Sequence, residues 1–128
     1  MNRLELAKRY LNEANILYTH NVQYELMCVC CFNHLKYLLQ EFLEENELYS
    51  NNIKNLTTLA KKCKLPELED YFDYFRVLQE IKDNQEPNED YCELTDFSEA
   101  SLIMNKLYKV SKIIKSNLKI MEESVWKN

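Results

Sequence analysis

The run from Leu26 to Phe32 contains no polar side chain, and it restricts the possible folds more than any other feature of the chain. Seven residues make nearly two turns of an α-helix, so a helix with this sequence presents apolar side chains in every direction. Such a helix must be covered by other elements on all sides. We therefore expect a central helix in which this run is the least exposed segment.

The chain of 128 residues contains no glycine. Tight connections between strands use glycine because it adopts positive φ without strain, whereas helices lose nothing by its absence. A chain of this length also folds as one domain with an ordinary core. We predict a single all-α domain over residues 1–128, built as an up-and-down antiparallel bundle of about five helices.

Apolar residues recur at helical spacing in five stretches of the chain. The polar break at 19–21 is short, which makes the first two helices antiparallel neighbours. Pro66 is expected to open the fourth helix, and Asp96 with Glu99 forms a capping box for the last one. The predicted helices cover about residues 3–18, 22–45, 53–63 with an N-cap among 50–52, 66–81, and 97–126 after an acidic loop.

Charge and cysteine content bear on location and partners. The net charge of −5 argues against a constitutively bound nucleic-acid protein, although it leaves room for a local basic patch. The five cysteines are an odd number, and the N-terminus lacks the apolar run of a signal peptide, so we expect reduced thiols and a cytoplasmic protein. No stretch approaches the roughly 18 uninterrupted apolar residues of a membrane span, so no membrane association is expected.

Three short patterns lead to a family resemblance. In chain order they are Ala7-x-x-Tyr10-Leu11-x-x-Ala14, Leu38-Leu39-x-x-Phe42-Leu43 and Asn55-Leu56-x-x-Leu59. Followed by a loop with a tyrosine and a long last helix, this order resembles the HEPN domains, helical bundles named for higher eukaryotes and prokaryotes nucleotide binding. The resemblance implies a homodimer and, for some members, a role as the substrate-binding partner of a minimal nucleotidyltransferase.

Nuclease members of that family resemble one another in an Arg followed four to six residues later by a His, the pair that cleaves RNA. No arginine of this chain precedes a histidine by that distance. The arginines are Arg3, Arg9 and Arg76, and the histidines are His20 and His34. Two further positions depart from the family pattern. Lys54 stands where a His often precedes the Asn-Leu, and Asp90-Tyr91-Cys92 stands where many members carry Arg-Tyr-Pro.

Metal-independent RNA cleavage needs a base with a pKa near neutrality and a cation for the developing phosphorane charge. Without the Arg and His pair, neither role has an obvious candidate. The favoured interpretation is a non-catalytic HEPN-like binding or interaction module. The alternative is a divergent RNase, or a toxin of a toxin–antitoxin type system, that uses Lys, Tyr or Glu instead.

Cys30 and His34 lie four residues apart on the expected central helix, a spacing that could give two ligands to zinc. No motif elsewhere in the chain completes such a site. Free cysteines are among the most buried residue types, so a core position explains Cys30 more simply than a metal does. We expect no metal and no other cofactor.

The last helix carries five lysines and no acid between Ala100 and Lys119. Such a concentration of charge can bind phosphate, although lysines at every third position also wrap the solvent side of an ordinary helix. For the binding function we choose Lys106, Lys109 and Lys112 as phosphate contacts for a nucleotide or RNA. Tyr91 in the acidic loop is the expected stacking residue for a base.

The same helix carries more large apolar residues than one face can bury internally. Flanking its core stripe are Phe97, Met104, Tyr108, Met121 and Trp126. A two-fold symmetric dimer through this helix would cover them, because the patch on one chain packs against the identical patch on the other. We therefore expect a homodimer.

Overall fold

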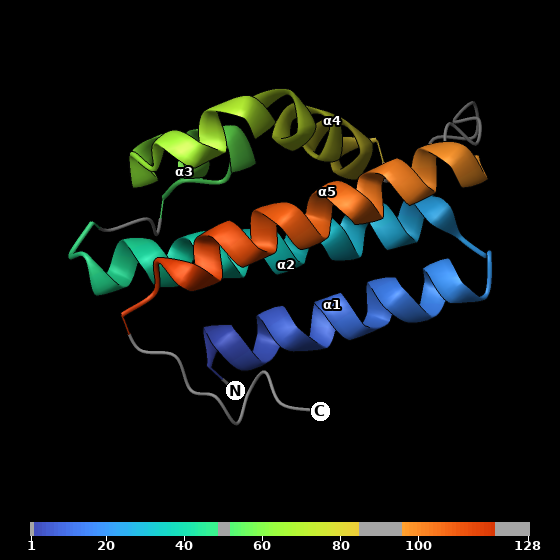
Figure 1. The fold of residues 1–128 in the computed structure, drawn as a ribbon, viewed down its shortest axis with the longest axis horizontal. Helices are drawn as coiled ribbons and strands as arrows, with labels where there is room; N and C mark the ends of the chain where they lie inside the picture. Colours follow the sequence, from blue (N-terminus) through green and yellow to red (C-terminus); the bar gives the residue numbers. More distant parts are fainter. Residues whose placement is uncertain (1, 49–51, 85–95, 120–128) are drawn as a thin grey trace.

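The computed structural model of the chain describes residues 2–48, 52–84 and 96–119. Helices are the regular secondary structure of these residues, with five α-helices, one short 3-10 helix and no strand (Figure 1). The predicted all-α bundle is thus confirmed. The elements are α1 (Arg3–Thr19), α2 (Tyr24–Glu45), α3 (Leu56–Cys63), η1 (Pro66–Tyr71), α4 (Phe72–Asp83) and α5 (Phe97–Ser116).

The central element is α2, which contacts α1, α3, α4 and α5 (Figure 1). Its buried residues include Met27, Cys28 and Phe32, as the apolar run predicts. The expectation that the whole run is the least exposed segment is wrong, because Leu26 is 45% exposed and Val29 is only partly buried. These two residues lie one turn apart on a side of α2 that the neighbouring helices leave partly open.

Helix α1 lies antiparallel to α2. A cap fixes its start, and a tight turn follows its end. The side chain of Asn2 accepts a hydrogen bond from the backbone N–H of Glu5 at 2.8 Å, which caps the first turn. Arg3 forms an ion pair with Glu44 at the far end of α2. In the turn between the helices, Asn21 and Gln23 adopt positive φ of 55° and 50°. The chain therefore makes this tight turn without a glycine.

The third and fourth helices differ from the prediction at their starts. Asn55 caps α3 by accepting from the Thr58 N–H at 3.1 Å, so the N-cap is not among 50–52. Pro66 opens η1 and not an α-helix, since the first bond spans three residues, from Leu68 N–H to the Leu65 carbonyl at 3.0 Å. The α-helical turn begins only at Phe72. This tighter helix buries Leu68 in the core.

Helix α5 begins as predicted and ends early. Asp96 accepts from the Glu99 N–H at 2.9 Å, which confirms the cap. The expected extension to about residue 126 is wrong, because the helix stops at Ser116 and the side chain of Asn117 donates to the Ile113 carbonyl at 2.8 Å. The chain then turns toward the end of α2, where the Lys119 N–H donates to Glu45 at 2.8 Å.

The buried residues of all these elements form one hydrophobic cluster. Among the helices of the described ranges, none combines the length and apolar character that crossing a bilayer requires. Met121 and Trp126, two of the residues expected to support a dimer, lie outside the described residues. Met104, a third, is buried in the monomer core at 1% exposure and cannot contribute to such an interface.

Candidate binding surfaces on the last helix

His34 lies at the junction of α1, α2 and α5 and is fully buried. Its Nδ1 is 2.6 Å from the Ala7 carbonyl, which can only accept, so this nitrogen carries the proton and donates. The Nε2 atom then accepts from the Ser111 hydroxyl at 2.9 Å. Burial lowers the pKa of His34 to about 4, with a further lowering by nearby Lys115 against the opposing effect of Ala7. His34 is therefore a neutral structural link near pH 7.

Burial favours the protonated form of three core thiols, those of Cys30, Cys31 and Cys63. Burial, together with the Glu13 carboxylate 3.8 Å away, raises the pKa of Cys30 to about 11. Burial raises the pKa of Cys63 to about 12, and that of Cys31 lies well above its ordinary value. The thiolate is the form that attacks electrophiles and binds metals, so these thiols are poorly reactive near neutral pH.

The spacing of Cys30 and His34 does not create a ligand pair. Cys30 faces Glu13 on α1, whereas both ring nitrogens of His34 bond to Ala7 and Ser111. Within the part of the chain that the structure describes, no group of three or more His, Cys, Asp or Glu residues is placed to hold a metal ion.

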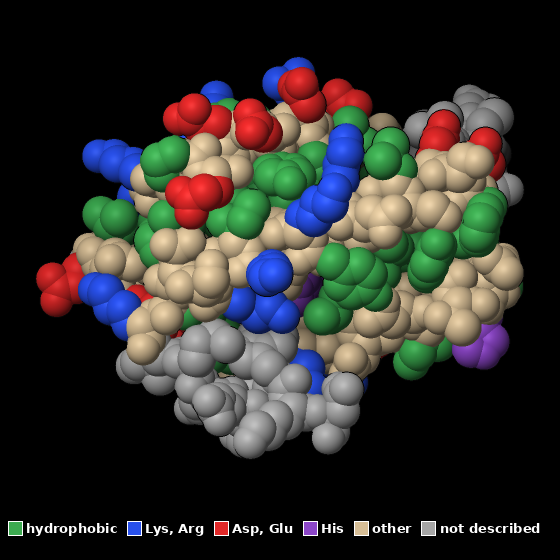
Figure 2. Space-filling view, viewed as in Figure 1, with side chains coloured by type: hydrophobic (Ala, Val, Ile, Leu, Met, Phe, Trp, Pro, Cys, Tyr) green, Lys and Arg blue, Asp and Glu red, His purple; other side chains and the backbone are tan. Residues whose placement is uncertain are grey.

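The three lysines chosen from the sequence share α5 but differ in their surroundings. Lys109 and Lys112 are exposed, while Lys106 is partly buried on the side facing α4. None of the three forms an ion pair with a residue that the structure describes. In Figure 2, Lys and Arg side chains lie over the middle of this face, and acids gather mainly along the edge formed by α3 and α4. Tyr91 lies outside the described residues.

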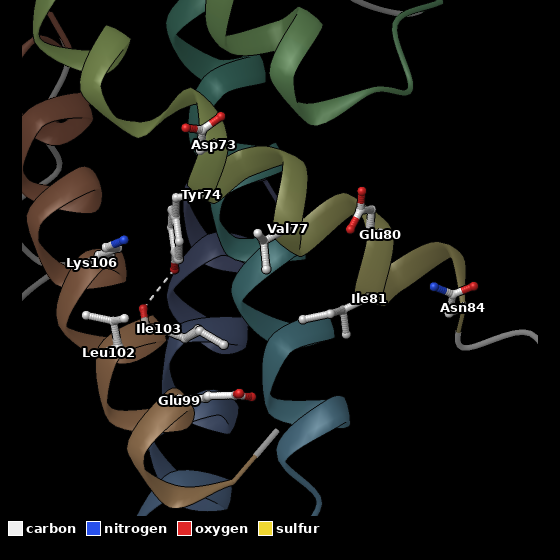
Figure 3. Close-up of a pocket in the computed structure, with 10 residues that line it drawn as sticks. All are labelled: Asp73, Tyr74, Val77, Glu80, Ile81, Asn84, Glu99, Leu102, Ile103 and Lys106. Carbon is white, nitrogen blue, oxygen red and sulfur yellow. Dashed lines mark hydrogen bonds between the residues drawn. The ribbon is translucent and has the colours of Figure 1, made fainter. Parts of the chain in front are cut away.

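A cleft of about 380 Å³ lies between α4 and α5 (Figure 3). Tyr74 donates its hydroxyl to the Ile103 carbonyl at 2.9 Å, and this buried bond joins the two helices. Val77 and Leu102 are 44% and 55% exposed at the cleft. The apolar part of the lining consists of Tyr74, Val77, Ile81, Leu102 and Ile103.

The polar part of this lining is mainly acidic. It consists of Asp73, Glu80, Asn84, Glu99 and Lys106. Asp73 forms an ion pair with Arg76 at 2.8 Å, whereas Glu80 and Glu99 have no ion-pair partner among the described residues. Among the described residues of the lining, Lys106 is thus the one cation beside three carboxylates. A phosphate held by Lys106 on the cleft side would meet these acids, so Lys109 and Lys112 offer the better anion surface.

No pattern in the sequence alone predicts this cleft. Its acids come from two helices that are separated by the acidic loop, and no local motif unites Asp73 and Glu80 with Glu99. A signal was available in the helical pattern. Val77 falls outside the buried stripe of α4, and Leu102 falls outside that of α5. When two such residues come from neighbouring helices, they can form one exposed apolar patch. Contiguous patches of this kind mark interaction sites.

Comparisons of the chain with protein-family models, with curated protein sequences and with solved structures gave no significant match. The likeness to HEPN domains accordingly rests on the residue patterns and the order of the helices.

Proposed function

We propose that the protein is a non-catalytic, HEPN-like binding module that holds a nucleotide or single-stranded RNA along α5. The observation that supports this most is the placement of Lys109 and Lys112, which are exposed on a protein with a net charge of −5. These two lysines lie roughly 4.5 Å apart along the helix axis at 1.5 Å per residue. Phosphates of a short anionic ligand would replace the counterions of these lysines.

The surroundings of the histidines support binding without catalysis. His34 has both nitrogens bonded inside the core and a pKa of about 4, so it cannot take a proton from a substrate at the surface. The ring of His20 lies at the end of α1, where Nδ1 is 2.8 Å from the Ile16 carbonyl. Neither histidine is paired with an arginine in the described structure.

Partner binding is the second part of the proposal. The HEPN resemblance implies self-association and, for some members, pairing with a minimal nucleotidyltransferase. Exposed apolar side chains on α5 support an interaction role, since Phe97 and Leu102 are more than half exposed and Tyr108 is 46% exposed. Phe97 stacks on Tyr18 with ring centroids 6.0 Å apart, which holds it in a fixed position at the surface.

The test is binding of fluorescein-labelled single-stranded RNA and of ATP, followed by anisotropy and by competition at several salt concentrations. Reversing Lys109 and Lys112 to Glu should weaken RNA binding at least tenfold. The slope of log affinity against log salt should become shallower by about 1.4, because two phosphate contacts are lost. The labelled RNA should remain intact after incubation.

The matched control is Lys54→Glu with Lys64→Glu, which changes the net charge equally at two exposed lysines outside α5. This control should retain most of the affinity. Equal losses in both double variants, or binding that does not respond to salt, would show that the α5 lysines are only solvated surface. Cleavage of the RNA by the purified protein would favour the alternative of a divergent RNase.

A further inference from the structure

We propose that the cleft between α4 and α5 is a docking groove for a basic amphipathic helix of a partner protein. This inference rests on the interaction part of the proposed function, and it names the chemistry of the partner. It does not depend on the anion surface of Lys109 and Lys112, which lies outside the cleft lining.

The cleft has an apolar lining that the described residues leave partly uncovered. In Figure 3, Val77 and Ile81 of α4 and Ile103 of α5 point into the space between the two helices. Ile81 and Ile103 are nearly buried and form the floor, while Val77 and Leu102 remain 44% and 55% exposed. Removing apolar surface of this kind from water favours association at roughly 25 cal/mol per Å². A partner must therefore supply apolar side chains that reach into the cleft.

The acidic side chains around the floor favour a positively charged partner. Asp73, Glu80 and Glu99 are exposed carboxylates of the lining, and Lys106 is the single cation among the lining residues that the structure describes. Because Glu80 and Glu99 have no ion-pair partner among the described residues, they can pair with incoming Lys or Arg side chains. Charge complementarity of this kind suppresses wrong partners as well as attracting the right one. An RNA or another acidic surface would be repelled here.

The length of the cleft suits a short helix. The lining runs from Asp73 to Asn84 on α4 and from Glu99 to Lys106 on α5. At 1.5 Å per residue these stretches are roughly 17 Å and 10 Å long, which matches two to three turns of an incoming helix. A helix bound in such a groove inserts residues at positions i, i+3 or i+4, and i+7. Three or four apolar anchors, with basic residues beside them, would complement both floor and rim.

The walls of the cleft are already fixed before binding. Tyr74 is buried at the floor, and its bond to the Ile103 carbonyl joins α4 to α5. A groove with fixed walls loses little conformational entropy when a ligand enters.

The experiment uses the full chain labelled with ¹⁵N and three synthetic helical peptides of equal length. The first carries Leu anchors at i, i+3, i+4 and i+7 with Lys and Arg beside them. The second has the same charges but Ser in place of Leu, and the third has the Leu anchors but Glu in place of the basic residues. The first peptide should shift the amide signals of Val77, Leu102 and their neighbours and should bind at least tenfold more tightly than either control.

Variants of the cleft then assign the binding to its apolar and acidic parts. Val77→Ser with Leu102→Ser should weaken binding of the first peptide at least tenfold, and Glu80→Gln with Glu99→Gln should weaken it and flatten its salt dependence. The matched controls are Ile16→Ser, at an apolar residue 57% exposed on α1, and Glu47→Gln with Glu67→Gln at exposed acids elsewhere. These should leave the affinity unchanged.

Three outcomes would overturn the docking groove. The first is equal binding of the first peptide to the Val77 and Leu102 double variant, or shifts of signals away from the cleft. The second is movement of the cleft signals with protein concentration alone, which would make a second copy of this chain the occupant. The third is a response of these signals to ATP or RNA instead of the peptide. The reversal of Lys109 and Lys112 is a separate experiment with a separate ligand. Failure of the docking groove can therefore be distinguished from failure of the anion surface.

Discussion

Helix α5 meets the rest of the bundle in two contrasting ways. Toward α1 and α2 the junction is closed, and its polar centre, His34, bonds to Ala7 and Ser111 without exposure to solvent. Toward α4 the junction is open at its outer side, with exposed Val77 and Leu102 above the buried bond from Tyr74 to Ile103. The difference indicates that the first junction stabilises the fold, whereas the second has surface available for binding.

The contrast predicts a large loss of stability from His34→Ala. The substitution leaves a cavity at the junction of three helices and removes the partners of the Ala7 carbonyl and the Ser111 hydroxyl. We expect the free energy of unfolding to fall by about 2 to 5 kcal/mol. Urea denaturation followed by circular dichroism measures the change. As a control, Asn33→Ala at the neighbouring, partly exposed position should cost about 0.5 kcal/mol or less.

The closed junction should also respond to pH. Folded His34 has a pKa of about 4, below its ordinary value of 6.5, so the unfolded chain gains a proton first as the pH falls. The contribution of neutral His34 to stability is fully present above pH 6.5 and is lost progressively down to about pH 4. The total loss attributable to this residue is about 3 kcal/mol.

The measurement is the free energy of unfolding of the wild type minus that of His34→Ala at each pH, so that the titration of carboxylates largely cancels. This difference should be constant above pH 7 and should shrink between pH 6.5 and 4. A difference that stays constant over that window would mean that His34 is accessible to protons in the folded state, and that the junction is not closed.

Much of the fold can be predicted because a helix is recognised from residues that lie close together in the sequence. The spacing of Leu4, Ala7 and Ala14 locates α1, and Asp96 marks the start of α5. The predictions were wrong where the exposure of a residue or the end of a helix depends on contacts with other residues. Leu26 is apolar but lies where no helix covers it, and the end of α5 depends on Asn117, whose side chain takes a helix carbonyl. Neither effect is visible in the apolar periodicity alone.

The binding surfaces were less predictable than the fold. The α5 lysines could be chosen from the sequence because they lie on one helix, although their selection as a site remains a prediction. The cleft could not be predicted from the sequence, because it depends on how close α4 lies to α5 and on which sides of the two helices face each other. The buried bond from Tyr74 to Ile103 fixes that approach, and the two residues are 29 positions apart. Only packing brings Val77 and Leu102 to the same cleft.

The smallest expected effect concerns that bond. Tyr74→Phe keeps the ring and removes the hydroxyl that donates to Ile103, so the Ile103 carbonyl loses a partner in a buried setting. We expect a loss of about 1 kcal/mol in the free energy of unfolding, the usual net value for one hydrogen bond. Because the same bond joins the walls of the cleft, amide exchange near Ile103 should also become faster. Tyr71→Phe, at a partly exposed ring close by, is the control and should change neither quantity. If the two variants behave alike, packing and not the hydrogen bond holds α4 against α5, and the open junction differs from the closed one in exposure alone.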